Sequence, residues 1–95
     1  MSGFVYILAN RKNGTLYTGV TNDIVRRTQE HKEEIEKGFT QRYAVKKLVW
    51  YEHFERFDEA ISFEKRIKRW RRDWKIQLIE KMNPTWNDLF REITH

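Results

Sequence analysis

Three stretches of alternating or continuous apolar residues along the chain are typical of β-strands. Residues 3–9 (GFVYILA), 15–21 (TLYTGVT) and 47–54 (KLVWYEHF) are each seven or eight residues long and rich in β-branched and aromatic side chains. Between the first two, residues 10–14 (NRKNG) contain the Asn13-Gly14 pair that tolerates a positive φ. The first two stretches are therefore predicted to form an antiparallel hairpin.

A first helix is predicted over residues 23–37. Polar residues at positions 21–23 can accept hydrogen bonds from its first N–H groups, and Gly38 suits the position just after its end. Residues three or four apart form its inward stripe, namely Ile24, Thr28, His31 and Ile35.

Two more helices and a last short turn complete the pattern. Asp58 and Asp73 are expected to cap helices over residues 58–72 and 73–82, Asn83-Pro84 ends the second of them, and residues 87–93 add a short turn. The order β-β-α-β-α-α predicts an α+β fold, in which helices flank a small three-stranded antiparallel sheet made of the hairpin and a third strand.

Length and composition narrow the class of protein. The 95 residues fit one domain, expected to span residues 1–95. Cysteine is absent, which excludes a disulfide scaffold, a thiol nucleophile and a cysteine-based zinc site. The longest apolar run, residues 4–9, is far shorter than the roughly 20 residues that span a bilayer, and no secretory leader is recognisable. We therefore expect a cytoplasmic protein without a membrane partner.

Positive charge is concentrated in one segment. The chain has 19 Lys and Arg against 14 Asp and Glu, and residues 65–75 (KRIKRWRRDWK) alone hold seven basic residues and one acid. Such a segment is either a solvated helix face or a surface that contacts phosphates. The candidate nucleic-acid contacts are Lys65, Lys68, Arg69, Arg71 and Arg72. Trp70, Trp74 and Trp86 are expected to lie in the core rather than to stack on bases.

Two tyrosines are expected on one face of the hairpin. A four-residue loop centred on Arg11 and Lys12 would place Tyr6 directly opposite Tyr17, and a two-residue loop at residues 13–14 would shift the pairing but keep both rings on that face. The pair is either a packing contact between strands or two phenols that project into one site.

Three further polar residues stand out by their position. Arg27 and His31 are four residues apart, so they lie on neighbouring turns, and an Arg there could bind phosphate oxygens. Glu64 falls inside the apolar arc of the second helix, where an acid is costly unless it is paired or bound to metal. The simpler interpretation of Glu64 is a marginal acid paired with Lys68 four residues on.

Taken in order, these residues resemble the GIY-YIG nucleases. The first element of that family matches Phe4-Val5-Tyr6, where Phe4 and Val5 depart from the literal Gly and Ile, and the second matches Tyr17-Thr18-Gly19. The remaining positions follow at the expected places: Arg27, His31, Glu64 and the late Asn83. The chain is most similar to stand-alone bacterial members and also resembles the N-terminal nuclease domain of the excinuclease of DNA repair.

The resemblance implies hydrolysis of phosphodiester bonds in DNA, in repair or recombination, with one divalent metal. The metal would be Mg²⁺, or alternatively Mn²⁺, held by Glu64. Arg27 would stabilise the phosphoryl oxygens, and His31 would assist proton transfer or orientation. Tyr6 or Tyr17 would orient or deprotonate the attacking water, and Arg27 and the metal would lower the pKa of that tyrosine. Gly19 and Asn83 would have supporting roles.

Several alternatives stay open at the level of sequence. A non-catalytic nucleic-acid-binding module on the same scaffold would explain the basic segment, and a structural domain with a merely solvated helix would explain it as well. The sequence does not decide between branched, damaged and ordinary DNA, or between DNA and RNA. It assigns neither the oligomeric state nor the tyrosine that acts as base.

Overall fold

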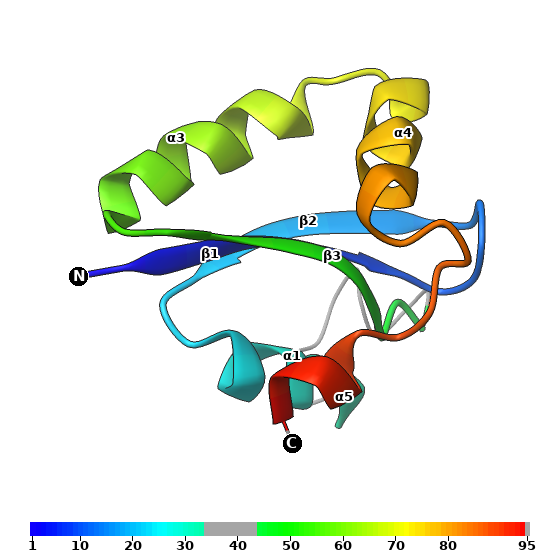
Figure 1. Ribbon diagram of the computed structural model, residues 1–95, viewed down its shortest axis with the longest axis horizontal. Coiled ribbons are helices and arrows are strands. Elements are labelled where there is room, and N and C mark those ends of the chain that lie inside the picture. Colours follow the sequence, from blue (N-terminus) through cyan, green and yellow to red (C-terminus); the bar gives the residue numbers. More distant parts are fainter. Residues whose placement is uncertain (34–43, 95) are drawn as a thin grey trace.

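The computed structural model describes residues 1–33 and 44–94 (Figure 1). Its elements are, in chain order, β1 (Gly3–Ala9), β2 (Leu16–Thr21), α1 (Ile24–Lys32), β3 (Lys47–Phe54), α3 (Phe57–Lys68), α4 (Arg72–Met82) and α5 (Phe90–Thr94). The predicted α+β fold and the order of its elements are therefore confirmed. None of the helices in these described residues is long and apolar enough to cross a membrane.

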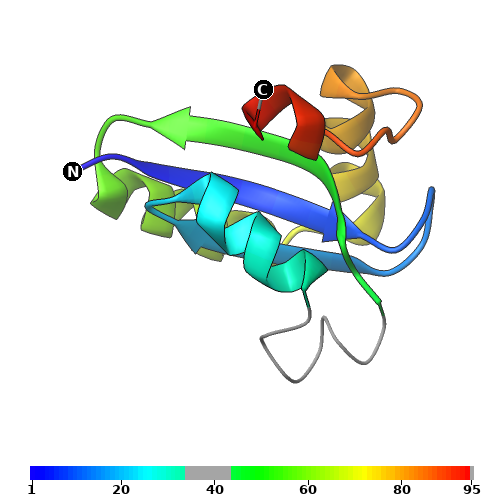
Figure 2. The same ribbon diagram turned by 90° about the horizontal axis from the view of Figure 1, so that it is seen from below.

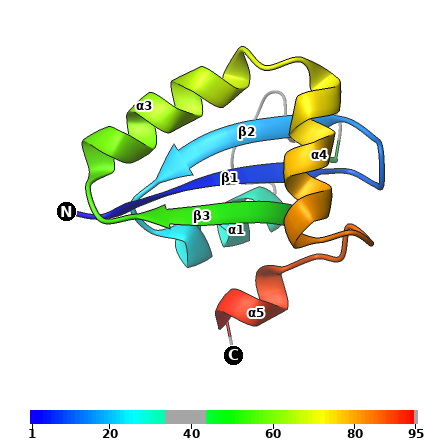
Figure 3. The ribbon, with the colours of Figure 1, turned by 45° about the horizontal axis from the view of Figure 1, so that its top comes forward.

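The three strands form one antiparallel sheet in the order β2-β1-β3, so that β1 is central. Helices α3 and α4 lie on one face of the sheet, while α1 and α5 lie on the other (Figures 1 and 2). Figure 3 shows α3 running along the side of β2 and α4 crossing the strands near the hairpin turn. Each face of the central strand is thus covered, which explains why β1 is almost entirely apolar.

Side chains of β1 alternate between two hydrophobic clusters. Toward α3 and α4, Val5 and Ile7 pack in a cluster with Ile67, Ile79 and Trp86. Toward α1 and α5, the buried residues are Tyr6, Leu8, Ile24, Val45, Leu48 and Leu89. Trp86 is fully buried, as predicted, and its indole Nε1 donates a hydrogen bond of 2.8 Å to the carboxylate of Glu80.

The start of α1 is as predicted, because the side chain of Asp23 accepts a hydrogen bond of 3.1 Å from the backbone N–H of Arg26. The inward stripe is confirmed at Ile24, Thr28 and His31, which are all buried. The predicted last turn of this helix, with Ile35 and Gly38, lies outside the described residues.

The predicted caps of the next two helices are wrong. Helix α3 begins at Phe57 and α4 at Arg72, so Asp58 and Asp73 each lie inside the first turn. The N-cap residues, Arg56 and Arg71, make no side-chain capping bond. An acid in the first turn is favoured by the helix dipole just as a capping acid is favoured by the free N–H groups, so the sequence signal is shared by both positions.

The long helix predicted through residue 72 ends at Lys68 instead. The chain then changes to hydrogen bonds between residues three apart, as in a 3₁₀ turn. The N–H of Arg69 donates to the carbonyl of Arg66 at 3.1 Å, and the N–H of Trp70 donates to the carbonyl of Ile67 at 3.1 Å. This break lets α4 leave the direction of α3 and cross the sheet (Figure 3).

Candidate active site

The hairpin register places the two tyrosines differently from either predicted loop. Ala9 pairs with Leu16, so Tyr6 lies opposite Gly19, while Tyr17 lies opposite Leu8. Both predicted registers are wrong by two residues, which preserves the expectation that the two rings share one face.

The turn explains this register. The side chain of Asn10 accepts a hydrogen bond of 2.9 Å from the N–H of Thr15, and the N–H of Gly14 bonds the carbonyl of Arg11 at 2.9 Å. Asn13 adopts a positive φ of 59°. The turn therefore covers residues 11–14, and the Asn10 side chain bridges its two ends. The resulting register lies midway between the two predicted ones.

Tyr6 is the centre of the site. It is 1% exposed, and its hydroxyl lies 3.2 Å from Nε2 of His31, within hydrogen-bond distance. His31 is itself only 3% exposed on α1. The two polar groups satisfy each other inside the cluster between the sheet and α1, which makes their burial tolerable.

Gly19 makes room for the Tyr6 ring. A Cβ atom on Gly19 would lie 2.5 Å from both Cζ and the hydroxyl oxygen of Tyr6, far inside van der Waals contact. Glycine is therefore required here for close approach of a side chain to the neighbouring strand. This gives the supporting role expected for Gly19 a steric reason.

Tyr17 completes a cluster of three rings. Its ring centroid lies 6.4 Å from that of Tyr6 and 5.3 Å from that of His31, and Tyr6 and His31 are 6.0 Å apart. Tyr17 is partly exposed, whereas the other two rings are buried. The packing contact between the tyrosines is therefore confirmed, while a shared chemical site for the two phenols stays a prediction.

Arg27 lies at the rim of this cluster, on α1. Its guanidinium Nη1 forms an ion pair of 3.2 Å with Glu30 Oε1, and the guanidinium also hydrogen-bonds the Tyr6 side chain. Glu30 was not among the predicted residues, although its i,i+3 spacing from Arg27 is a signal for such a pair. The ion pair holds the Arg27 side chain near the phenol.

The protonation of Tyr6 differs from the expectation. Burial raises the pKa of the Tyr6 phenol from 10.0 to about 12, and this exceeds the opposing effect of the hydrogen bond from Arg27. The nearby Tyr17 and Glu64 raise the pKa further. In the metal-free protein, the predicted lowering of this pKa by Arg27 is therefore outweighed, because the ring is almost completely removed from water.

Glu64 on α3 is buried as well as paired. It is 6% exposed, and its Oε2 lies 2.7 Å from Nζ of Lys68. The predicted inward position of Glu64 and its predicted pairing with Lys68 are therefore both confirmed, while its alternative placement at the margin of the helix is wrong. Its charge is close enough to act on the Tyr6 phenol, so the acid and the hairpin belong to one electrostatic environment.

The basic segment lies at the surface. All five predicted contact residues are exposed: Lys65, Lys68, Arg69, Arg71 and Arg72. Arg72 donates hydrogen bonds to the carbonyls of Asn13, at 2.7 Å, and Gly14, so it ties the start of α4 to the hairpin turn. Lys68 and Arg71 form ion pairs with Glu64 and Asp73, the latter an exposed pair of 3.4 Å. The segment is thus partly structural, and its exposed cations can still face an anionic partner.

Asn83 makes structural contacts in the chain after α4, and one of the predicted core tryptophans is exposed. Asn83 is 4% exposed, and its amide donates to the carbonyls of Val49 and Asn87 at 3.1 and 2.8 Å while its Oδ1 accepts from the N–H of Asn87 at 3.0 Å. It therefore holds the chain after α4 against β3. Trp74 is 48% exposed, so its predicted core position is wrong, while Trp70 packs against the core as predicted.

Comparison with known proteins places this site in a family. Residues 2–77 match the GIY-YIG catalytic domain, a stretch that includes Tyr6, Tyr17, Arg27, His31 and Glu64. The chain belongs to the GIY-YIG family. Asn83 lies beyond the matched stretch.

The chain is also similar to proteins named UPF0213. It is 37% identical over 90 residues to a UPF0213 protein of Clostridium perfringens, covering 95% of this chain and 96% of that one. It is 36% identical over 78 residues to one from Haloquadratum walsbyi, covering 82% and 86%. The solution structure of a UPF0213 protein from Bacillus halodurans superposes with a TM-score of 0.58, at 31% identity and over 93% of each chain.

The donor set of the site fits a magnesium-type ion. Among residues 1–33 and 44–94, no group of three or more His, Asp or Glu side chains is arranged to hold a metal. A single buried carboxylate, Glu64, is consistent with Mg²⁺, which takes one or two carboxylates and completes its shell with water and substrate phosphate.

Proposed function

We propose that this GIY-YIG protein is a metal-dependent endonuclease that hydrolyses phosphodiester bonds in DNA, with structure-selective or weak sequence preference, in repair or recombination. The observation that carries the proposal is the convergence on one buried phenol. Tyr6 is hydrogen-bonded by Arg27 and His31 and also lies within the electrostatic reach of Glu64. A tyrosine that only packs in the core does not require Arg27, His31 and Glu64 around its hydroxyl.

The charged residues supply two complementary functions. Arg27 offers a planar set of donors to the phosphoryl oxygens, whose charge increases in the transition state. Glu64 would hold a divalent cation, most simply Mg²⁺, which when bound supplies positive charge to the phosphate and its leaving oxygen. The Glu30 partner of Arg27 keeps the guanidinium beside the phenol before substrate binds.

The two tyrosines are proposed to have different roles. Because burial raises the pKa of Tyr6 to about 12, its hydroxyl stays protonated at neutral pH and acts as a donor that orients its neighbours. Tyr17 is partly exposed beside it and is the phenol that substrate and water can reach. We therefore assign proton transfer from the attacking water to Tyr17 rather than to Tyr6.

DNA is the proposed substrate because of the exposed basic residues near the acid. Lys65 and Lys68 follow Glu64 in the last turns of α3 and Arg69 caps its end, so exposed cations that could neutralise DNA phosphates lie close to the acid along the chain. Binding of this kind weakens steeply with salt, so it should be measured at a stated ionic strength.

The test is a cleavage assay on flapped, branched and duplex DNA with Mg²⁺ or Mn²⁺. We expect Glu64→Gln to lower the cleavage rate by at least about 100-fold, the scale of removing one group that stabilises transition-state charge. Glu59→Gln is the matched control, since Glu59 is an exposed acid on the same helix, and it should cut at the wild-type rate. Equal rates for Glu64→Gln and the wild type would contradict the assignment.

The ion pair of Glu64 favours a second candidate, a nucleic-acid-binding module without catalysis. Lys68 already neutralises the Glu64 carboxylate at 2.7 Å, so a metal would have to displace or share this partner. The module would bind DNA with strong salt dependence and cut no substrate with either metal. In the nuclease, Lys68→Met should instead tighten metal binding, measured as a lower Mg²⁺ concentration for half-maximal cleavage.

A further inference from the structure

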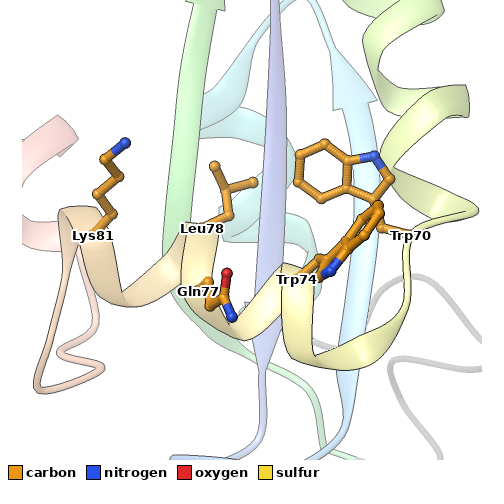
Figure 4. Close-up of a pocket in the computed structure, with 5 residues that line it drawn as sticks. All are labelled: Trp70, Trp74, Gln77, Leu78 and Lys81. Atoms are coloured by element: carbon orange, nitrogen blue, oxygen red, sulfur yellow. The ribbon is translucent and has the colours of Figure 1, made fainter.

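A pocket of about 300 Å³ lies on α4, outside the site just described (Figure 4). It is lined by Trp70, Trp74, Gln77, Leu78 and Lys81. In Figure 4, Trp70, Leu78 and Lys81 rise on one side of α4, with the indole of Trp74 directed toward that of Trp70. The pocket thus combines two large flat rings with an amide and an ammonium group.

The two indoles meet at a right angle. Their centroids are 6.1 Å apart and their planes differ by 82°, so one ring presents its face where the other presents its edge. Trp70 is held in this orientation by Phe63, which it also meets edge-on at 6.2 Å. A flat ligand can stack on one indole while its edge contacts the other, and the backing by Phe63 keeps that corner rigid.

The exposure of Trp74 is unusual in this chain. Among the large hydrophobic residues that are exposed in the described part of the chain, Trp74 is the aromatic one, with 48% of its surface exposed. Leaving an indole half in water forgoes burial of apolar surface, while the other tryptophans of the described chain are buried or half-buried. The Arg71 guanidinium lies over the Trp74 ring, 5.2 Å from its centroid, so a cation accompanies the exposed indole.

The surroundings of the pocket are positively charged and lead toward the proposed metal site. Lys75 Nζ lies 3.4 Å from the carbonyl of Lys68, and burial together with the charges of Arg72 and Lys68 lowers the pKa of Lys75. Lys68 in turn is the ion-pair partner of Glu64, one helical turn away. The cations near the pocket are thus connected, through Lys75 and Lys68, to the ion pair of Glu64.

We propose that this pocket binds an unpaired nucleobase of the DNA substrate, stacked on Trp74, while Arg71 and Lys75 contact the adjoining phosphates. The proposal takes DNA as the ligand from the proposed function but does not depend on cleavage. Aromatic side chains combined with a basic groove are the usual recognition of single strands, because every base has a flat face that can stack. Paired bases are closed to such stacking, so the pocket would favour DNA with an unpaired segment over a continuous duplex.

The test compares two single strands that differ only in their bases. One is a thymidine oligonucleotide of about 10 nucleotides, within the range of single-strand site sizes. The other is an abasic strand with the same number of phosphates. Binding is followed by fluorescence anisotropy in EDTA, so that neither a metal nor cleavage contributes. We expect Trp74→Ala to weaken binding of the thymidine strand by about 5- to 150-fold, the loss typical of one stacked base, and to leave the abasic strand within about twofold.

Two variants and the wild type make the outcome decisive. Trp74→Phe should restore most of the binding, and Met82→Ala should change nothing, since Met82 is another exposed apolar residue of α4 that does not line the pocket. If Trp74→Ala fails to fold, the wild type alone must still bind the thymidine strand more tightly than the abasic strand. Equal losses for both strands, or no loss for either, would overturn the proposal.

The result is separable from that of the proposed nuclease. Base-dependent binding that Trp74→Ala removes, together with no cleavage under any metal, would contradict the nuclease and leave the pocket in place. Cleavage that depends on Glu64, together with binding indifferent to Trp74, would do the reverse.

Discussion

Replacing Gly19 with alanine should damage the protein through a single ring. The added methyl carbon would lie 2.5 Å from Cζ and from the hydroxyl oxygen of Tyr6, and 3.0 Å from Cε1, where ordinary contact begins near 3.4 Å. The phenol end must therefore move by about 1 Å. Tyr6 is 1% exposed and its hydroxyl is 3.2 Å from His31 Nε2, so this movement pushes the ring into packed neighbours and lengthens a hydrogen bond already at the upper limit of distance.

The expected loss of stability follows from three contributions. An extra methyl in a packed core costs about 1–3 kcal/mol, and loss of the Tyr6–His31 hydrogen bond adds about 1 kcal/mol. The lower entropy of the unfolded chain offsets about 0.4–1 kcal/mol of this. We expect Gly19→Ala to lower the free energy of unfolding by about 2–3 kcal/mol.

A double-mutant cycle in urea tests the cause as well as the magnitude. Tyr6→Leu removes the atoms that the new methyl would meet, so in that background Gly19→Ala should no longer destabilise the protein, and the unfolded-state contribution should raise the free energy of unfolding by up to about 1 kcal/mol. Tyr17→Leu is the matched control, because Tyr17 lies on the same face but its atoms are not those that meet the methyl. In the control background the full loss should remain.

The reasoning would be refuted by a loss that does not depend on Tyr6. If Gly19→Ala destabilises the protein equally in the wild-type and Tyr6→Leu backgrounds, glycine is needed for the backbone of β2 and not for the approach of the ring. A destabilisation below about 0.5 kcal/mol in the wild type would show that the phenol can shift freely, contrary to its packing.

Two further outcomes follow from the same contacts. Titrated by tyrosinate absorbance without metal, one phenol should ionise near pH 12 and vanish from the titration in Tyr6→Phe. Because this pKa is about 12 in the folded state and 10.0 otherwise, the unfolded chain loses its proton first, and stability should fall between pH 10 and 12 by up to about 3 kcal/mol. A flat profile would contradict this expectation. Asn83→Ala should lower the free energy of unfolding by about 2–3 kcal/mol, because it leaves backbone groups of Val49 and Asn87 without partners. Asn87→Ala is the control, since it removes an exposed side chain. In the same urea experiment it should change the free energy of unfolding by no more than about 0.5 kcal/mol.

The fold was largely predictable because its signals are local and repeated. The bounds of β1 and β3 were predicted to the residue, since each is a short run rich in β-branched, aromatic and other apolar residues. The N-caps predicted at Asp58 and Asp73 each lie two residues after the observed ones, Arg56 and Arg71, because the helix dipole and the capping position favour the same acidic residues. The break after Lys68 has no glycine or proline to announce it, so only the packing of Trp70 and α4 on the sheet determines it.

The positions of the candidate site residues were predictable from the sequence, but the protonation of Tyr6 was not. Helical and strand periodicity were enough to place His31 inward and both tyrosines on one face. The raised pKa of Tyr6 depends on how completely α1 and β2 exclude water from its hydroxyl, which is a property of the whole arrangement. The exposure of Trp74 was missed for the same reason, since an aromatic at helical spacing gives no sign of which neighbours will cover it.

The hydrophobic core and the site share Tyr6, and this decides how variants of the site can be interpreted. Tyr6 belongs to the cluster that α1 and α5 bury, so any change at Tyr6, His31 or Gly19 alters folding and chemistry together. Tyr17 and Arg27 lie at the rim, partly exposed, where a side chain can be shortened with less effect on the core. A loss of activity in Tyr17→Phe or Arg27→Ala at unchanged urea midpoint is therefore the result that would separate a chemical role from a structural one.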